Sequence, residues 1–157
     1  MLRSWLQVFM LQGFFMLLIA YPIFLHGFQG KAGFNLADLA GLLVWLLGFG
    51  FETIGDAQML RFKNDPANRG KIMNQGLWRY TRHPNYFGEA TMWWGIFFIT
   101  LNTQFSFWAI LSPIVITWLL LKVSGVPMLE QKYAGDNEYQ SYVKQTSSFL
   151  PRRPRRK

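Results

Sequence analysis

Four long runs of hydrophobic residues, separated by shorter polar segments, dominate the pattern along this chain. The runs are Trp5–Leu25, Leu36–Ile54, Tyr86–Leu101 and Phe105–Val123. Each comes close to the roughly 20 apolar residues with which a helix crosses the hydrocarbon core of a bilayer. The pattern therefore predicts an all-α integral membrane protein, in which residues 1–157 form a single domain built as a four-span helical bundle.

The first run has an alternative interpretation as a cleaved signal peptide, because Arg3 precedes it. It is, however, about twice as long as the hydrophobic region of an ordinary signal peptide. Residues 27–33 also offer no convincing small-residue cleavage site. We therefore interpret the first run as a membrane span.

Charge gives the predicted bundle a direction. The 16 Lys and Arg residues outnumber the 8 Asp and Glu residues, and most of them lie between the second and third runs or in the tail PRRPRRK. Lys31 is the only cation between the first two runs, and residues 102–104 carry none. Because Lys and Arg in short loops stay on the cytoplasmic side, we expect the long basic loop and both termini to be cytoplasmic.

The tail from residue 124 is predicted to lie on the cytoplasmic surface, with an interfacial helix from about Pro127. Its arginines suit anionic lipid headgroups, at about 1 kcal/mol for each cation near the surface. Nucleic acid is not an expected partner, because no aromatic residue stands among these arginines.

The composition excludes several kinds of chemistry. There is no cysteine, so disulfides, thiolate nucleophiles and zinc–thiolate sites are absent. With His26 and His83 as the only histidines, no metal centre is expected.

Carboxylates at the inner ends of two spans are unusual, because a charge inside a membrane normally faces a partner or a cavity. Glu52 and Asp56 are four residues apart and share a helix face, as do Asn85 and Glu89. We expect these four side chains to line the cytoplasmic mouth of the bundle. The alternative is that they reach water at the interface or pair with arginines of the basic loop.

The segment GLWRYTRHPNYFGE, from Gly76 to Glu89, combines cations and aromatics at a predicted helix start. Pro84 suits the first position of a helix, whose free N–H groups would join Arg82 and His83 in holding an anion. Trp78 and Tyr80 add flat faces for a nucleotide base. Arg, Trp and Tyr are equally the ordinary anchors of a membrane interface, so composition alone leaves both interpretations open.

The order of residues in this segment resembles the cofactor-binding half of the steroid 5-alpha-reductase superfamily, especially its bacterial members of undefined function. The resemblance continues through Trp93-Trp94-Gly95 and Ser124-Gly125-Val126-Pro127 to Phe149-Leu150-Pro151, and so covers about the last two thirds of the chain. It implies a bacterial inner-membrane protein whose cytoplasmic loops and helix ends enclose NADPH. The reaction it implies is reduction of an activated carbon–carbon double bond in a lipophilic, steroid-like substrate.

The resemblance also implies which residues bind the cofactor. Positions that hold or neighbour the nucleotide are matched by Asp56, Asn85, Glu89 and Tyr139. Neighbours of its phosphates are Arg82 and His83, with Lys63 near a further basic position. Tyr80 is the candidate stacking face. Glu130 is expected either to contact the cofactor or to hold its helix to an arginine of the basic loop.

The catalytic acid stays unknown at this stage. In typical relatives, the groups that polarise the substrate carbonyl lie in additional amino-terminal spans. Because an apolar run follows almost directly on Met1, we expect that half to be missing here. Glu52 and Tyr21 are weak candidates to replace them. The chain is therefore expected to be either an enzyme or a cofactor-binding half that needs a missing amino-terminal partner.

Two other functions remain open. Isoprenylcysteine carboxyl methyltransferases share the Arg-His-Pro-x-Tyr element and bind S-adenosylmethionine, whose carboxylate the arginine would hold. A small non-catalytic scaffold is the second alternative. The reductase is favoured because the basic loop suits a multiply charged nucleotide better than a zwitterion.

Four glycines in the second span, Gly41, Gly48, Gly50 and Gly55, are expected to let a neighbouring helix approach closely. A wide substrate cavity would need more than four spans, so a homodimer is a further hypothesis.

Overall fold

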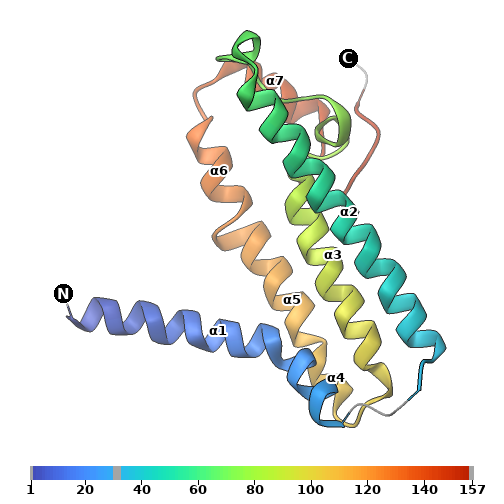
Figure 1. Cartoon of the computed structure of the whole chain (residues 1–157). Coiled ribbons are helices and arrows are strands. Elements are labelled where there is room, and N and C mark those ends of the chain that lie inside the picture. The colour runs from blue at the N-terminus through green and yellow to red at the C-terminus, as the bar shows by residue number, and fades with distance from the viewer. Residues whose placement is uncertain (1, 30–32, 156–157) are drawn as a thin grey trace.

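The computed structural model describes residues 2–29 and 33–155, with side chains from Leu6 onward, and it is helical without a strand over these ranges (Figure 1). Three segments are long and apolar enough to cross a membrane, namely Leu6–Gln29, Leu36–Asn64 and Ser106–Lys132. They support an integral membrane protein. Lys31, Arg156 and Lys157, three of the cations behind the predicted orientation, lie outside the described residues.

Helix α1 (Leu2–Gln29) projects from the bundle along most of its length and joins it only near its carboxyl end (Figure 1). Pro22 lies inside the helix, where a missing N–H and a bulky ring favour a bend. Beyond it, Leu25 packs with Phe97 and Ala109 in a small buried cluster. The predicted boundaries Trp5 and Leu25 are therefore too narrow, since the helix extends beyond the apolar run at both ends.

Helix α2 (Leu36–Asn64) starts at a capping box, in which the Asn35 side chain accepts bonds from backbone N–H groups of the first turn and the Asp38 carboxylate accepts one from the Asn35 backbone N–H. It has 29 residues, ten more than the predicted span that ended at Ile54. Its polar last turns contain no helix breaker before Asp65-Pro66. The helix therefore carries Asp56 and Lys63 beyond the apolar run.

Helix α3 (Pro84–Ile99) runs beside α2 (Figure 1), and Pro84 occupies the first turn, as predicted. With 16 residues it is as long as the predicted span Tyr86–Leu101, but it begins and ends two residues earlier. It is not among the three segments that are long and apolar enough to cross a membrane. A 3-10 turn, η3 (Thr100–Asn102), replaces the last predicted residues of the span.

The two helices touch through glycines spaced seven residues apart on each. A Cβ on Gly41 would lie 2.6 Å from the Gly95 oxygen, and a Cβ on Gly48 would lie 2.6 Å from the Gly88 oxygen. Because ordinary contact begins near 3.4 Å, neither position admits a side chain unless the backbones move apart. The predicted close approach is confirmed at these positions.

Gly55 continues the seven-residue series and faces the ring of Pro84. Gly50 does not, and a Cβ there would meet no atom within 4 Å. The prediction was wrong for Gly50, because two residues turn the helix by about 200° from Gly48 to another face.

The fourth apolar run forms a broken helical column. Its parts are α4 (Ser106–Ala109), α5 (Leu111–Trp118), the π-helical turn η4 (Leu119–Val123) and α6 (Val126–Lys132). A helix does begin next to Pro127, as predicted, and α6 continues the column of α5 within the third apolar segment (Figure 1). Its interfacial position stays a prediction. Helix α7 (Asn137–Gln145) follows and lies across the end of the bundle.

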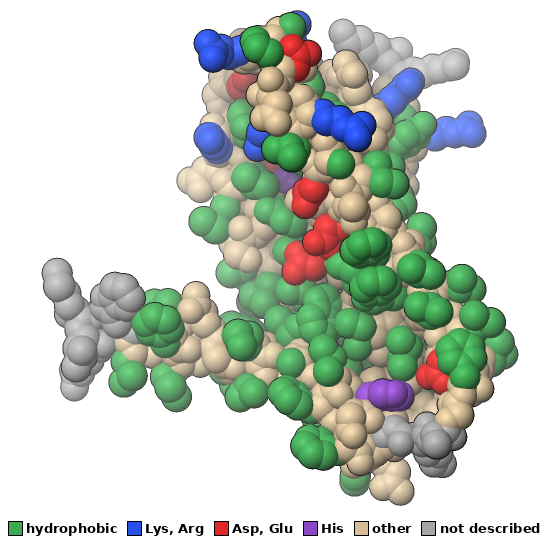
Figure 2. Space-filling model, viewed as in Figure 1, with side chains coloured by type: hydrophobic (Ala, Val, Ile, Leu, Met, Phe, Trp, Pro, Cys, Tyr) green, Lys and Arg blue, Asp and Glu red, His purple; other side chains and the backbone are tan. Residues whose placement is uncertain are grey.

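Lysine and arginine side chains gather at this end of the molecule, whereas hydrophobic side chains cover most of the rest of the visible face (Figure 2). We call it the basic end; it comprises residues 56–85 and 126–155. Two 3-10 turns complete it, η1 (Pro66–Asn68) and η2 (Gly76–Arg79).

Candidate functional site

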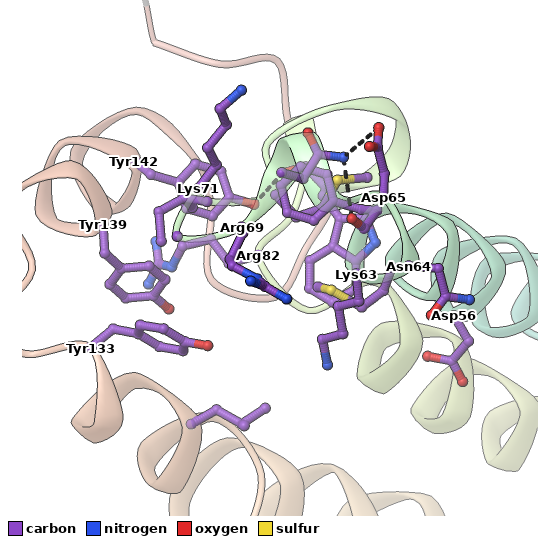
Figure 3. Close-up of a pocket in the computed structure, with 18 of the residues that line it drawn as sticks. Asp56, Lys63, Asn64, Asp65, Arg69, Lys71, Arg82, Tyr133, Tyr139 and Tyr142 are labelled. Carbon is purple, nitrogen blue, oxygen red and sulfur yellow. Dashed lines mark hydrogen bonds between the residues drawn. The ribbon is translucent and has the colours of Figure 1, made fainter.

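A cavity of about 540 Å³ opens at the basic end, between the last turns of α2, the loop 65–73, the start of α3, and α6–α7 (Figure 3). Its size is typical of small-molecule sites, which span roughly 300–1,000 Å³. Six of the residues predicted to bind a cofactor line it: Asp56, Lys63, Arg82, His83, Asn85 and Tyr139.

The loop after α2 is folded so that its cations reach the rim of the cavity. Asp65 caps η1 through a bond from the Ala67 N–H (2.9 Å), and the Asn68 amide donates to the Phe62 carbonyl at 3.2 Å. Gly70 then turns the chain with φ of +78°, a conformation that costs glycine little. Arg69 and Lys71 consequently line the same cavity as Lys63 (Figure 3).

The turn η2 holds one wall of the cavity against α2. The Leu77 N–H donates to the Gln58 side chain at 2.9 Å, and the Trp78 indole N–H donates to the Gly55 carbonyl at 3.0 Å. Trp78 is buried, and its indole N–H is committed to this bond. It is therefore a fixed aromatic wall of the cavity.

Arg82 joins α6 and α7 to the segment before α3. Its guanidinium contacts Glu130 Oε1 at 2.7 and 2.9 Å and donates to the carbonyls of Val143 (3.2 Å) and Thr146 (2.5 Å). Arg82 is buried, whereas Glu130 is partly exposed. Most of the hydrogen-bonding capacity of Arg82 is thus used to hold the fold together. Glu130 takes the structural role that the sequence left open for it, because it holds its helix to this arginine.

His83 is buried at the start of α3, and its ring stacks on Tyr86 with centroids 5.4 Å apart. Its Nε2 lies 3.2 Å from Glu130 Oε1, and its Nδ1 is buried without a hydrogen-bond partner. Burial lowers the pKa of His83 below its ordinary value of 6.5, although Glu130 works in the opposite direction. The ring is therefore neutral at pH 7: Nε2–H donates to Glu130, and Nδ1 is left as an acceptor.

Three tyrosines form the wall opposite α2, and two of them lie on one face of α7 (Figure 3). Tyr139 stacks on Tyr133 at 5.0 Å, and its ring meets Tyr142 edge to face at 6.0 Å. The Tyr142 hydroxyl donates to the Trp78 carbonyl. Burial raises the pKa of Tyr139 and of Tyr142, so both hydroxyls keep their protons at neutral pH.

The cavity carries an excess of positive charge. Lys63, Arg69, Lys71 and Arg82 line it, against two carboxylates, Asp56 and Asp65. Among the described side chains, Arg82 and Glu130 form an ion pair, and the neutral His83 adds a hydrogen bond to the same carboxylate. The three other cations of the cavity therefore keep their charges available for a ligand.

The remaining predicted residues lie elsewhere. Tyr80 lines a second hollow on the other side of η2 and α7. Glu89 lies on α3 within electrostatic reach of Glu52, outside the cavity lining. Tyr21 packs against the cluster of Leu25 and Phe97 at the far end of α3, about 20 Å from His83 by the helical rise.

Arg69, Lys71, Tyr133 and Tyr142 also line the cavity, although the sequence did not identify them as site residues. A usable signal existed for Tyr142, which shares a helix face with Tyr139 three residues earlier. Tyr133 precedes the turn between α6 and α7, so no periodic pattern points to it.

Residues 1–146 match the model of a protein family described as "Protein of unknown function (DUF1295)". No curated protein and no solved structure matches the chain.

Proposed function

The chain belongs to the DUF1295 family, and we propose that it is a membrane-embedded, NADPH-dependent reductase of a carbon–carbon double bond in a lipophilic, enone- or steroid-like substrate. One observation carries the proposal. A cavity of about 540 Å³ at the end of the apolar helices combines an aromatic wall with three cations that form no ion pair among the described residues. A phosphorylated dinucleotide needs both features, because its phosphates require cations and its rings require flat apolar faces.

The residues present fit such a cofactor. Lys63, Arg69 and Lys71 would hold phosphate groups, and Tyr139 would present its ring to a base or to the nicotinamide. The buried Nδ1 of His83 has no donor among the described residues and would accept a hydrogen bond from a ribose hydroxyl or an amide. Bound NADPH supplies a hydride; the task of these side chains is to orient it and to exclude water.

The substrate would meet the cofactor on the membrane side of the cavity. Asp56 lines the cavity, and Glu52 lies one turn deeper on the same face of α2. Acidic side chains are grouped there among hydrophobic ones (Figure 2). We propose Glu52 as the acid near the substrate carbonyl, and not Tyr21, which lies at the opposite end of α3.

We further propose that α3 with η3 is the fourth crossing element. Its glycine contacts keep it against α2 from Gly88 to Gly95, so it is as deep in the bundle as α2 over that length. The basic end would face the cytoplasm of a bacterial cell, together with both termini, because the described residues of the opposite end, 33–36 and 100–106, carry no Lys or Arg.

A second candidate is an S-adenosylmethionine-dependent methyltransferase. The tyrosine cluster favours it, because a sulfonium cation is attracted to aromatic faces, and Asp56 could accept the ammonium group. The excess of cations argues against it, since this cofactor carries a positive charge of its own.

The test is to titrate the detergent-purified protein with NADPH and, separately, with S-adenosylmethionine, and to record heat and tryptophan fluorescence. Saturable binding of NADPH, followed by its oxidation when enones are added, is the expected result. Binding of S-adenosylmethionine alone would establish the methyltransferase instead, and binding of neither would leave a non-catalytic scaffold.

A further inference from the structure

A second hollow lies on the other side of the wall formed by η2 and α7, and the function proposed above does not use it. Its volume is about 970 Å³, and Arg79, Arg153 and Arg155 line it with Glu138 as the only carboxylate of the lining. Among the described residues, none of the three arginines forms an ion pair. We propose that this hollow binds a phosphate group, carried by the headgroup of an anionic membrane lipid.

Hydrogen bonds fix the three segments that supply the arginines to one another. The Arg152 N–H donates to the Tyr80 carbonyl, and the Arg155 N–H donates to the Gln145 carbonyl, both at 3.0 Å. The hydroxyl of Thr146 donates to the Arg79 carbonyl at 3.4 Å. The tail is therefore tied to both η2 and α7, and the backbone places the guanidinium groups around one space.

The position of the hollow along the bundle points to a lipid. After α7, the chain runs back along the start of α3, where Phe149 meets Phe87 with centroids 5.8 Å apart. Leu150 is 49% exposed beside them. The tail thus reaches the level at which the apolar part of α3 begins. In a membrane that α3 crosses, the arginines that follow would lie at the level of the headgroups.

Arginine suits this ligand better than lysine would. Its planar guanidinium presents paired donors that match two phosphate oxygens. The lining also contains neutral polar groups, Gln145 among them, which can donate to the rest of a headgroup. Tyr80 is 42% exposed at the rim, as expected for an aromatic side chain at a membrane interface.

The experiment compares Arg153→Ala with Arg152→Ala, a matched control one residue away that removes the same charge but does not line the hollow. Binding of a soluble short-chain phosphatidylglycerol, and separately of inorganic phosphate, is measured by calorimetry in neutral detergent. We expect Arg153→Ala to weaken lipid binding about tenfold, as for a lost charged hydrogen bond, and Arg152→Ala to change it less than twofold.

The two ligands distinguish the source of the phosphate. If Arg153→Ala loses lipid binding and Arg152→Ala does not, the result supports a site for the lipid headgroup. If Arg153→Ala loses only the binding of inorganic phosphate, the result supports a phosphate site but contradicts the lipid as its ligand. Equal affinities for the lipid in the unmodified protein and both variants, or an equal loss of affinity in Arg153→Ala and Arg152→Ala, would overturn the proposed site. Arg79→Ala, on the opposite wall, decides the question if Arg153→Ala does not fold.

Discussion

Adding one methyl group at Gly48 should separate α2 from α3, whereas the same change at Gly50 should not. A Cβ at Gly48 would lie 2.6 Å from the Gly88 oxygen and 2.7 Å from the Met92 nitrogen, about 0.8 Å inside the 3.4 Å of ordinary contact. Both atoms belong to the backbone, so no side chain can turn away to relieve the clash. A Cβ at Gly50 would meet nothing within 4 Å.

The magnitudes follow from this difference. Forcing a methyl group into a packed contact costs about 1–3 kcal/mol. Replacing an unhindered helical glycine by alanine instead adds up to about 1 kcal/mol of stability. At about 2–4 °C per kcal/mol for a chain of this size, Gly48→Ala should lower the unfolding temperature by several degrees, and Gly50→Ala should raise it or leave it unchanged.

Thermal unfolding in detergent, followed by tryptophan fluorescence, measures both variants under the same conditions. Each protein must first elute as a single peak in size-exclusion chromatography, so that unfolding is compared from the same folded state. Equal unfolding temperatures for the two variants would refute the close contact of α2 and α3. A larger decrease in the unfolding temperature for Gly50→Ala than for Gly48→Ala would mean that a different face of α2 packs against α3.

Three further changes test the basic end. Arg82→Ala leaves the Glu130 carboxylate with His83 as its remaining partner, so the free energy of unfolding should fall by about 1.5–3 kcal/mol in denaturant titrations. Arg82→Lys should recover only part of this loss, and full stability in Arg82→Ala would contradict the contacts. Tyr142→Phe removes the hydroxyl that donates to the Trp78 carbonyl and should cost about 1 kcal/mol, whereas no measurable loss would mean that this bond contributes nothing. Because the pKa of His83 is lowered in the fold, the unfolded chain binds an extra proton below pH 6.5; stability should be complete above that pH and decline as the pH falls through it. His83→Gln should flatten this decline in unfolding temperatures recorded from pH 8 to 5, and an identical slope would assign it to other groups.

The hydrophobic runs predicted which parts of the chain are helical, because the formation of an apolar membrane helix depends on local composition. Their boundaries were less accurate. The run ending at Ile54 stops where apolar residues stop, but α2 continues to Asn64 because backbone bonding continues through polar residues until Asp65-Pro66. Near Pro127, the proline correctly predicts the start of α6, but it does not predict that this helix continues the column of α5.

The site was predictable where its residues cluster at the ends of two predicted helices. Asp56 and Lys63 end one helix, His83 and Asn85 begin another, and the cavity lies between them. Tyr80 belongs to the same motif but faces the second hollow.

The sequence could not show how the tail folds back. Ser147 accepts a bond from the Arg82 N–H at 2.8 Å across more than sixty residues of chain. No periodicity encodes such a contact, so the fold-back that closes the cavity and forms the second hollow was invisible without the structure. The consequence for Arg82 is that its partners are internal, although its sequence context favoured a phosphate.

The most direct test of the proposed cofactor site is the affinity of NADPH for Lys63→Ala relative to Arg61→Ala. Both cations are exposed in the last turns of α2, but Lys63 lines the cavity and Arg61 does not. We predict that Lys63→Ala weakens NADPH binding about tenfold, as for a lost charged hydrogen bond, while Arg61→Ala binds within twofold of the unmodified protein. Equal affinities in the two variants would contradict a cofactor site in this cavity.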